Sequence, residues 1–495
     1  MSGHERKSNS QPVVDEVHHE AQGLAKGSLS PGKIVAFALA SQTPAVALAT
    51  VPFLLVVTAG NGSWLGALLA AAATGCVGIA VITFARRFVV TGSLYSYMSH
   101  VFGAWARLLV GATLLLGYVT LIAGVLMLTG IYAGSFLIAV GVESGLDAPV
   151  MTALTSVAML AAAALAYRGL DASIRSAVIL TVATVPIVLL ITIASAVHTG
   201  LDLGAQLSLK GASLSGIFQG VAAGAVFLVA FESSAALAAE TRDAKRNVPV
   251  AVMSIPVVLG AIYLITTVLQ VPGLIAAADA ISAGGSPAGA LAQQAGLGTP
   301  FATATDLVLA IANLASLIAF VNYGSRFVAT LATDGLLPGV AARIHPRFKT
   351  PSMAIIGLSL LSMGFLLALV WRYPHELLAK VFPALSTVTV YMWVIPWVLV
   401  CVGAIVLVVR ENRARFALVA LAVLGAVGVS WVYINGLVNA PAPPVDAMSY
   451  VFLLAAGSVF AVFFFLDRRR RRRIHVGEGA GDELAADDPG PARTR

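Results

Sequence analysis

Long apolar runs separated by short polar segments make up most of this chain. A helix needs about 20 mainly apolar residues to cross the hydrocarbon of a bilayer. Segmented on that basis, the chain has twelve such runs, at residues 34–58, 64–84, 107–140, 150–167, 174–197, 217–239, 249–270, 304–331, 352–371, 379–409, 416–435 and 449–466. The stretch 88–103 is too short and polar to span, and we expect it at the membrane interface. The pattern predicts an all-α polytopic membrane protein.

Composition supports that class and excludes others. The 495 residues are 59% hydrophobic and 11% charged, whereas soluble domains carry about 25% charged residues. Cys76 and Cys401 both lie inside apolar runs and predict no disulfide framework. The net charge is +7, but the basic residues occupy short loops and a tail. They form no folded basic surface of the kind that binds nucleic acid.

The distribution of Lys and Arg predicts the topology. With both termini cytoplasmic, nearly all of the 30 basic residues fall on the inner side, and only Lys210, Arg372 and Lys380 fall outside. Residues 1–33 form a polar tail without a cleavable signal pattern, and 467–495 form a basic and then low-complexity tail; we expect both to be disordered. The predicted location is the cell (plasma or inner) membrane, with both termini inside.

Glu232 is an isolated carboxylate inside the sixth run. At that depth it costs on the order of 3 kcal/mol unless it is paired or faces a polar cavity, and intramembrane ionisable groups are functional by default. Arg326, in the eighth run, is the obvious partner, and we expect the two to interact directly or through water. The pair could be structural only, or it could respond to a proton or a substrate.

Two of the runs contain helix-breaking residues. Ser41-Gln42-Thr43-Pro44 interrupts the first, where Pro44 lacks an N–H and crowds the preceding turn; Gly220 and Gly224 loosen the sixth. Paired broken helices, one in each half, are typical of transporters built from inverted repeats, whose site lies near the bilayer midplane. The alternative for the first break is an ordinary proline kink.

The sequence contains no motif that indicates an enzyme or an ion channel. The chain has no HExxH, paired CxxC, GxSxG or Walker sequence. The cluster His18-His19-Glu20 lies in the polar tail and predicts no metal site, and no ring of charges suggests a channel filter. We therefore expect neither an enzyme nor a bound metal or cofactor, apart from H+ or Na+ as a coupling ion.

Three sequence blocks resemble the amino-acid permeases of the amino acid–polyamine–organocation superfamily. The first, Phe227-Leu-Val-Ala-Phe-Glu232 with 239–249, is similar to their sixth helix and the loop after it. The second, Asn322 to Pro338 with 345–351, is similar to helix eight and its following loop. The third, Arg86 to Gly103, resembles the loop between helices two and three. The resemblance covers essentially the whole chain.

The resemblance implies a LeuT-like fold with twelve transmembrane helices. Ten of them would form the transport core, 34–409, as a 5+5 inverted repeat of about 34–200 and 215–409, with helices one and six broken; residues 416–466 would add two more. Substrate would bind between the broken helices. Backbone amides would hold its carboxylate, and carbonyls would hold its ammonium group. These substrate-binding positions correspond to Ser41, Gln42, Thr43 and Ala45 for the amides and to Phe227, Leu228, Val229 and Ala230 for the carbonyls. Phe231 or Phe227 would either gate the site or only pack.

The chain departs from the family pattern in three places. Ser-Gln-Thr-Pro replaces a Gly-Ser-Gly-like break, and Ala230 replaces the usual glycine before Phe-Glu. The fifth run has no Lys, and Thr184 falls near the position where some proton-coupled members carry one. Proton coupling through Glu232, sodium coupling and exchange without a coupling ion therefore all stay open.

The functional expectation is a permease, a secondary active transporter that moves an amino acid or a related amine by alternating access. Its partners would be the small-molecule substrate and the lipid bilayer, and no oligomeric state follows from the pattern. A second acidic residue deep in a span is lacking, which disfavours dibasic substrates. Two alternatives stay open: another small solute on the same scaffold, such as a polyamine, a nucleobase or K+, and a sensor that moves nothing.

Overall fold

The computed structural model describes residues 23–282, 286–374, 376–413 and 415–486, with side chains up to residue 470 except those of Ala223 and Ser282. Helices account for nearly all of it. They are α1 (Pro31–Ser41), α2 (Pro44–Ala59), α3 (Ser63–Ala85), α4 (Leu94–Ser99), α5 (Ala104–Ala139), α6 (Ala148–Tyr167), α7 (Leu170–Thr199), α8 (Leu203–Leu207), α9 (Leu214–Gly224), α10 (Ala244–Ser254), α11 (Gly260–Ala276), α12 (Ala278–Ser282), α13 (Pro287–Gln294), α14 (Thr299–Thr333), α15 (Ser352–Arg372), α16 (Phe382–Arg410), α17 (Phe416–Val438) and α18 (Met448–Ala486).

Short irregular helical turns interrupt or join these helices. The 3-10 turns are η2 (Gly60–Gly62), η3 (Glu143–Leu146), η4 (Ala225–Phe227), η5 (Phe231–Glu240) and η7 (Gly339–Ala342), and the π-helical turns are η6 (Ile255–Leu259) and η8 (Leu377–Val381). The β pairing in the described residues is one isolated parallel bridge between Leu29 and Thr241. The predicted all-α class is confirmed.

Eleven helical stretches in the described chain are long and apolar enough to cross a membrane. The longest, Pro44–Ala85, joins α2 and α3 through the single turn η2, so the predicted runs 34–58 and 64–84 meet there. The shorter apolar helix Pro31–Ser41 supplies the beginning of the first predicted run. The remaining ten stretches correspond in order to the other ten predicted runs.

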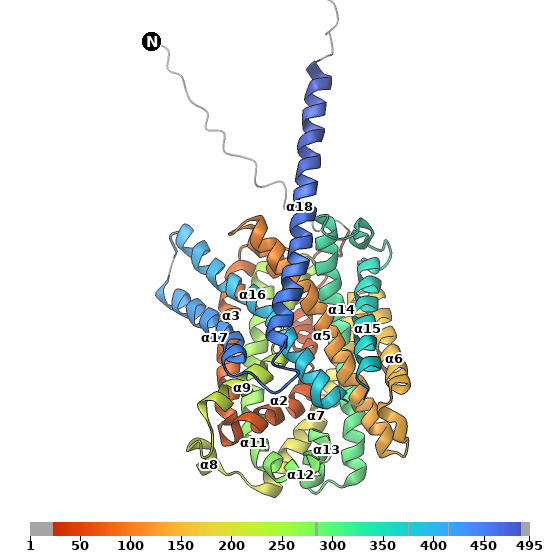
Figure 1. Cartoon of the computed structure of the whole chain (residues 1–495), viewed down its shortest axis with the longest axis vertical. Helices are drawn as coiled ribbons and strands as arrows, with labels where there is room; N and C mark the ends of the chain where they lie inside the picture. Colours follow the sequence, from red (N-terminus) through yellow and green to blue (C-terminus); the bar gives the residue numbers. More distant parts are fainter. Residues whose placement is uncertain (1–22, 283–285, 375, 414, 487–495) are drawn as a thin grey trace, which may run out of the picture.

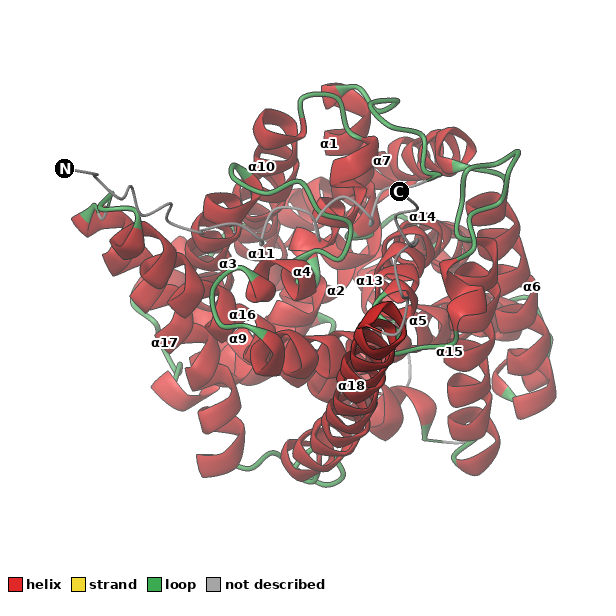
Figure 2. Cartoon of the chain, turned by 90° about the horizontal axis from the view of Figure 1, so that it is seen from above, coloured by secondary structure: helices red, strands yellow, loops and turns green. Residues whose placement is uncertain are grey.

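The bundle is organised around α5 and α14, which are the most deeply buried of these stretches. They pack against each other and are flanked by α7, α15, α16 and α18 (Figure 2). In Figure 1, α8, α12 and α13 lie at one end of the bundle, and α18 rises beyond the opposite end. Both α17 and the described side chains of α18 are largely exposed, so these two helices line the periphery rather than the core.

Side-chain caps and small residues fix where helices begin and how closely they approach. Ser213 and Ser286 cap α9 and α13 by accepting from the N–H groups of Gly216 and Gly289, at 2.9 and 3.0 Å. On α5, a Cβ at Gly117 would lie 2.5 Å from the Trp393 ring, so only glycine lets this indole lie against α5. The short helix α4 lies in the predicted non-spanning stretch 88–103, and its residues 94–98 are buried because they pack on α5 and α16; its place at the membrane interface stays a prediction.

Candidate functional site

The first interruption lies where Pro44 predicts it. Helix α1 ends at Ser41, α2 begins at Pro44, and Thr43 between them has a left-handed backbone with φ of 45°. The Ala47 amide donates to Thr43 O at 3.0 Å. The amides of Ala45 and Val46 precede it in the first turn, where a helix offers no internal acceptor. Within the described residues, neither amide meets a protein acceptor. The break therefore presents two free donors at a helix N-terminus.

The second interruption lies between α9 and η5. Leu228 donates to the carbonyl of Ala225 at 2.9 Å, and Ala230 then turns into the left-handed region with φ of 61°. Ser233 N–H donates back to Ala230 O at 2.9 Å. In the described part of the chain, the carbonyls of Leu228 and Val229 receive no protein hydrogen bond. This break therefore presents free acceptors, the complement of the first.

A cavity of about 50 Å³ lies between the two interruptions. The breaks, α5, α14 and α16 supply its walls: Ser41, Gln42, Thr43, Thr120, Leu121, Gly124, Val125, Leu128, Val226, Phe227, Val229, Asn313, Ser316, Phe320, Phe382, Ser386 and Thr389. We call it the central cavity. The Nδ2 of Asn313 is buried and has no hydrogen-bond partner among the described residues. The cavity therefore combines an apolar side with several polar groups that can still bind a ligand.

The structure brings together five of the nine predicted substrate-binding residues: Ser41, Gln42, Thr43, Phe227 and Val229 line the central cavity. The other four, which are Ala45, Leu228, Ala230 and Phe231, are buried but are not among the lining residues. Leu228 lines a separate small hollow with Val51 and Tyr263 instead. The Phe231 ring packs on Trp397 at 5.6 Å between centroids, which matches the packing alternative.

Sequence reasoning missed the polar residues on the scaffold helices. Asn313 and Ser316 lie three apart on α14, and Ser386 and Thr389 lie three apart on α16. Residues at that spacing share one helix face. Polar pairs on otherwise apolar spans were the available signal, since polar groups inside a membrane protein must face a partner or a cavity.

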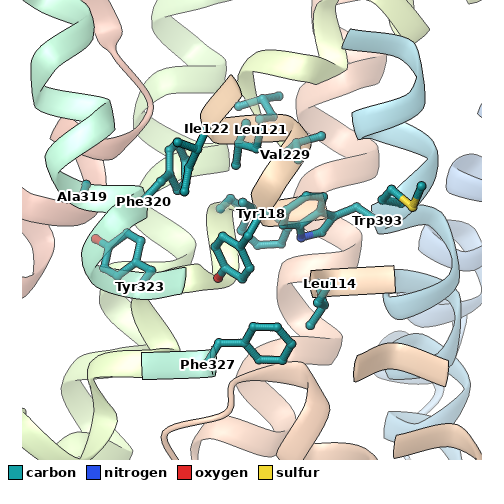
Figure 3. Close-up of a cluster of buried hydrophobic side chains, with 14 of the residues drawn as sticks. Leu114, Tyr118, Leu121, Ile122, Val229, Ala319, Phe320, Tyr323, Phe327 and Trp393 are labelled. Atoms are coloured by element: carbon teal, nitrogen blue, oxygen red, sulfur yellow. The ribbon is translucent and has the colours of Figure 1, made fainter. Parts of the chain in front are cut away.

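An aromatic layer underlies the central cavity on one side (Figure 3). Tyr118 on α5 lies at its centre, with ring centroids 5.6 Å from both Trp393 and Phe327. The Tyr118 hydroxyl donates to Ser233 Oγ at 2.7 Å, which ties α5 to η5. On α14, Phe320 lines the cavity, and Phe327 lies two turns further along. These contacts of Tyr118 join α5 to α14, α16 and η5 on this side of the cavity.

Glu232 is held by two indoles rather than by a basic group. Its carboxylate accepts from Trp393 Nε1 at 2.8 Å and from Trp397 Nε1 at 3.1 Å, one indole on each oxygen. The two tryptophans lie one turn apart on α16, and Glu232 is 1% exposed. Because an indole can only donate, both oxygens of Glu232 act here as acceptors.

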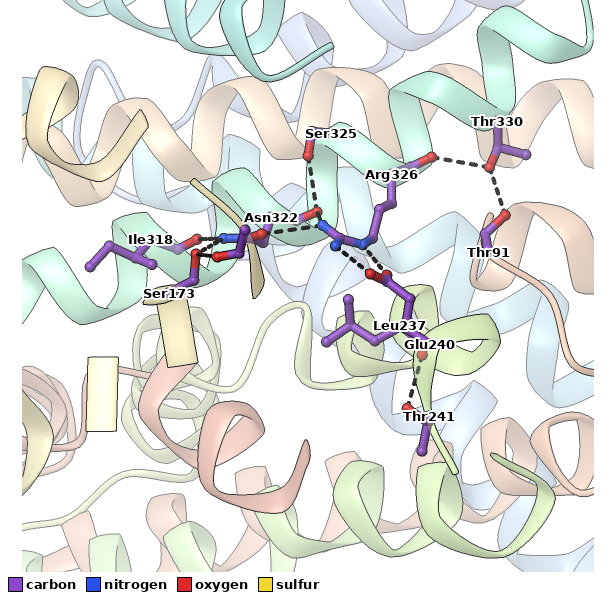
Figure 4. Close-up of polar contacts among 11 residues, drawn as sticks. Thr91, Ser173, Leu237, Glu240, Thr241, Ile318, Asn322, Ser325, Arg326 and Thr330 are labelled. Atoms are coloured by element: carbon purple, nitrogen blue, oxygen red, sulfur yellow. Dashed lines mark hydrogen bonds and ion pairs between the residues drawn. The ribbon is translucent and has the colours of Figure 1, made fainter. Parts of the chain in front are cut away.

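Arg326 pairs with Glu240, and the described ion pairs include none between Glu232 and Arg326, so the direct form of the predicted interaction is wrong, while an interaction through water stays a prediction. Arg326 Nε and Nη2 bind the two oxygens of Glu240 at 2.5 and 2.9 Å, and Nη1 donates to the Asn322 carbonyl at 3.0 Å (Figure 4). Both side chains of the pair are almost fully buried. Because the backbone unwinds at 228–230, Glu240 faces α14, whereas Glu232 faces α16. We call this pair with Asn322 the Arg326 clasp.

The Arg326 clasp connects to the beginning of the described chain. The backbone N–H of Leu29 donates to Glu240 O, and Arg242 N–H donates to Leu29 O, both at 2.9 Å. On α14, Asn322 Nδ2 donates to Ser173 Oγ on α7 at 3.0 Å. The segment before α1, the end of η5, α7 and α14 are therefore tied together at one end of the bundle.

Thr184 lies on α7, away from the walls of the central cavity. It is buried, and its hydroxyl donates to the Leu180 carbonyl of its own helix at 2.7 Å. A coupling role for Thr184 stays a prediction.

Paired interruptions around a small polar cavity, inside a bundle of apolar helices, define a membrane transporter with discontinuous helices. The chain belongs to the amino acid permease family, whose model matches residues 34–464. Members of this family are transporters and not enzymes.

Individual relatives are more distant. The chain is 25% identical over 316 residues to the branched-chain amino acid permease BcaP of Bacillus subtilis, a match covering 60% of this chain and 65% of that protein. It is 25% identical over 299 residues to the methylthioribose transporter of the same species, covering 57% and 62%. The matches therefore span somewhat less than two thirds of these relatives.

Among solved structures, the chain is similar to a Na+-coupled sialic acid symporter in a substrate-bound outward-open state. The TM-score is 0.55 at 14% identity, over 86% of this chain and 92% of that one. At this identity the likeness establishes the LeuT-type fold and nothing about the solute.

Proposed function

We propose that this protein is a secondary active transporter that carries an amino acid, or a closely related amine, across the cell membrane by alternating access. The observation that carries the proposal is the pair of interruptions, one offering free amides and the other free carbonyls, on either side of the central cavity. A zwitterion needs both kinds of group within a few ångströms of each other. Family membership supports the same function.

The two ends of the solute would be held by different breaks. The first amides of α2, Ala45 and Val46, would bind the carboxylate, because a helix N-terminus carries partial positive charge. The carbonyls of Leu228 and Val229 would bind the ammonium group. Ser41, Gln42 and Thr43 would then shape the site rather than supply its main donors, and Asn313 would add a further donor.

The apolar wall favours an aliphatic side chain. Leu121, Val125, Leu128 and Phe382 line the central cavity, and none of its described lining residues is charged, so none would pair with a basic or acidic side chain. The similarity to the branched-chain amino acid permease of Bacillus subtilis points the same way. The present volume of about 50 Å³ holds only a few waters, so binding would require the breaks to move apart.

Glu232 would couple the cycle to protons. Its two oxygens already accept from Trp393 and Trp397. A proton on one oxygen would make that oxygen a hydrogen-bond donor. Its contact with the indole would weaken, because an indole N–H cannot accept a hydrogen bond. Protonation would thereby loosen η5 from α16. Sodium coupling and exchange without a coupling ion remain the alternatives. Thr184 would take part in sodium coupling.

The Arg326 clasp would close one end of the pathway. It ties η5 to α14 and, through Leu29, to the segment before α1. Rocking the broken helices against the scaffold would require this clasp to separate.

The proposed topology has twelve spans in a 5+5 inverted repeat with two added helices and both termini inside. Impermeant maleimide should then reach Lys210→Cys from outside and Arg413→Cys only after permeabilisation.

The test is counterflow in proteoliposomes, with each of the twenty amino acids preloaded in turn against radiolabelled leucine. Aliphatic amino acids should drive labelled uptake, and dibasic ones should not. Exchange by no amino acid would refute the proposal.

A second solute class has one supporting observation, the methylthioribose transporter among the relatives. If methylthioribose drives uptake of its own label and no amino acid competes, the alternative is correct. A protein that moves neither solute would favour the sensor.

A further inference from the structure

A second cavity, of about 270 Å³, lies at the end of the bundle that carries α12 and α13. We call it the outer cavity. The end of α5, the helix α13 and the beginning of α14 form its walls, and its polar lining is Ser135, Ser286, Gln293, Thr303 and Asp306. It is several times larger than the central cavity and opens toward the surface of the bundle.

Asp306 is the one charged group among the lining residues of the outer cavity. It is 7% exposed, and its Oδ1 has no hydrogen-bond partner within the described residues. Among the described residues that line the cavity there is no Lys, Arg or His, and the described ion pairs do not include Asp306. The uncharged Ser286 hydroxyl is a hydrogen-bond partner of this carboxylate, but a buried negative charge without a counterion stays costly. The protein therefore leaves one acceptor of high charge density unused beside an open space.

The remaining lining suits an ammonium group with a short alkyl chain. Ser135, Thr303 and Gln293 add oxygen acceptors, which an ammonium group with its three donors can use together with Asp306. Ile138, Leu146 and Ala302 supply apolar surface for the carbon atoms. A metal ion would instead need several oxygen ligands at short range, and the described residues contain no cluster of three His, Cys, Asp or Glu side chains.

The outer cavity lies in line with the central cavity. Ser135 follows Leu128 of the central cavity by seven residues on α5, and Asp306 precedes Asn313 by seven on α14. Seven residues are two helical turns, about 10.5 Å, on nearly the same face. Between the two levels, the hydroxyls of Tyr132 on α5 and Thr50 on α2 hydrogen-bond at 3.0 Å.

The surroundings carry negative charge. The segments next to the outer cavity expose Glu143 and Asp147 after α5, and Asp202 and Asp279 lie exposed at the same end of the bundle. The basic residues that the predicted topology places at this end are Lys210, Arg372 and Lys380, and Lys380 pairs with Glu376 at 2.8 Å, so acidic groups outnumber basic ones. A mouth with this balance attracts cations and raises their local concentration.

We propose that the outer cavity is a binding site for an organic monoammonium ion, with Asp306 as its anionic ligand. The geometry further suits a transient binding position, from which a solute enters the central cavity when the Tyr132–Thr50 hydrogen bond opens. This entry step rests on the proposed function, whereas ammonium binding at Asp306 does not.

The probe is n-butylammonium chloride, titrated into the purified full-length protein by isothermal calorimetry with choline chloride holding the ionic strength. Asp306→Asn removes the charge, and Asp171→Asn at the beginning of α7 is the control because it removes an exposed carboxylate away from the outer cavity. Wild type and Asp171→Asn should bind saturably with the same affinity. Asp306→Asn should weaken binding by about tenfold or more.

A second variant protects the test against misfolding. Ala139→Trp starts from an exposed position that lines the outer cavity, so it fills the mouth and leaves Asp306 intact. It should weaken butylammonium binding as strongly as Asp306→Asn. Unchanged butylammonium binding in both variants would overturn the proposal. Binding of Na+ from NaCl with the same affinity as butylammonium would overturn it as well. Neither result depends on flux, so a failure to transport amino acids would count against the proposed function alone.

Discussion

At the residue scale, the polar side chains buried in the bundle decide how the protein can respond to its surroundings. Glu232 is bound by two donors that carry no charge, whereas Arg326 has a full carboxylate partner in Glu240. A proton can therefore change the contacts of Glu232 without breaking an ion pair. Breaking the Arg326 clasp, in contrast, would leave a buried charge uncompensated.

Glu232→Gln should abolish uphill uptake driven by a pH gradient while preserving exchange down a solute gradient. Glutamine keeps one acceptor oxygen for an indole but cannot take up or release a proton. The measurement compares both modes in proteoliposomes of wild type and variant. A pH-driven uptake that survives the substitution would eliminate Glu232 as the coupling group.

Glu240→Gln should destabilise the protein by about 3 to 5 kcal/mol, the range for breaking a buried ion pair. The matched control is Asp171→Asn, which removes the exposed partner of Lys33 and should cost at most about 1 kcal/mol. Denaturant unfolding in detergent measures both. Equal losses in the two variants would mean that the Arg326 clasp does not stabilise the fold.

At the element scale, the function depends on helices that stop and restart. Pro44 explains the first break because it lacks a donor, and Thr43 before it takes a left-handed backbone. The second break has no proline and turns at Ala230 instead. Each break leaves backbone groups unpaired at membrane depth, which is tolerated only where they face protein or a cavity.

Ala230→Gly should leave solute binding intact and raise the free energy of unfolding by between zero and about 1 kcal/mol. Glycine removes the roughly 1 to 2 kcal/mol strain of a left-handed alanine but adds freedom to the unfolded chain. Ala230→Val should be strongly destabilising, because a β-branched residue fits neither that backbone nor the fully buried position. Thermal unfolding of the three proteins tests this order, and a valine variant as stable as wild type would contradict the strained turn.

The breaks were accessible from sequence, but their consequences were not. Pro44 and Gly224 locate the interruptions, and the residues at 41–43 and 227–229 follow from them. The partner of Arg326 could not be predicted, because Glu232 and Glu240 lie on one interrupted segment whose 3-10 turns alter which side chain faces α14. The spacing of Trp393 and Trp397 was visible, yet only the Gly117 contact shows why an indole reaches Glu232. Asp306 escaped notice because it lies near the beginning of its span.

At the scale of the whole molecule, the scaffold is fastened at the end opposite α12 and α13. Arg87 after α3 binds Glu411 after α16 through Nε and Nη2, at distances of 2.6 to 3.0 Å. Arg107 on α5 pairs with Asp334 after α14 at 2.9 Å. Together with the Arg326 clasp, these contacts close the end at which α18 emerges.

Acidification should weaken the Arg87–Glu411 fastening. The Arg87 guanidinium holds the pKa of Glu411 below its ordinary value. The stabilisation is therefore complete above the unfolded pKa, about 4.3, and is lost as pH falls through the lower folded pKa. The stability difference between wild type and Glu411→Gln should be at most about 1 kcal/mol at pH 7, since the pair is partly exposed. It should shrink as pH falls below the unfolded pKa and vanish below the lower folded pKa, and a difference that grows on acidification would contradict the assignment.

Saturation binding of an aliphatic amino acid to the purified protein tests the central cavity most directly. Gly124→Leu adds a side chain into that cavity, where a Cβ meets only Leu385 at 3.8 Å, so the backbone tolerates it. Gly364→Leu is the control, because no atom lies within 4 Å of its Cβ position on exposed α15 surface. Wild type and Gly364→Leu should bind leucine equally, and Gly124→Leu should not bind it. Undiminished binding by a folded Gly124→Leu protein would contradict this prediction.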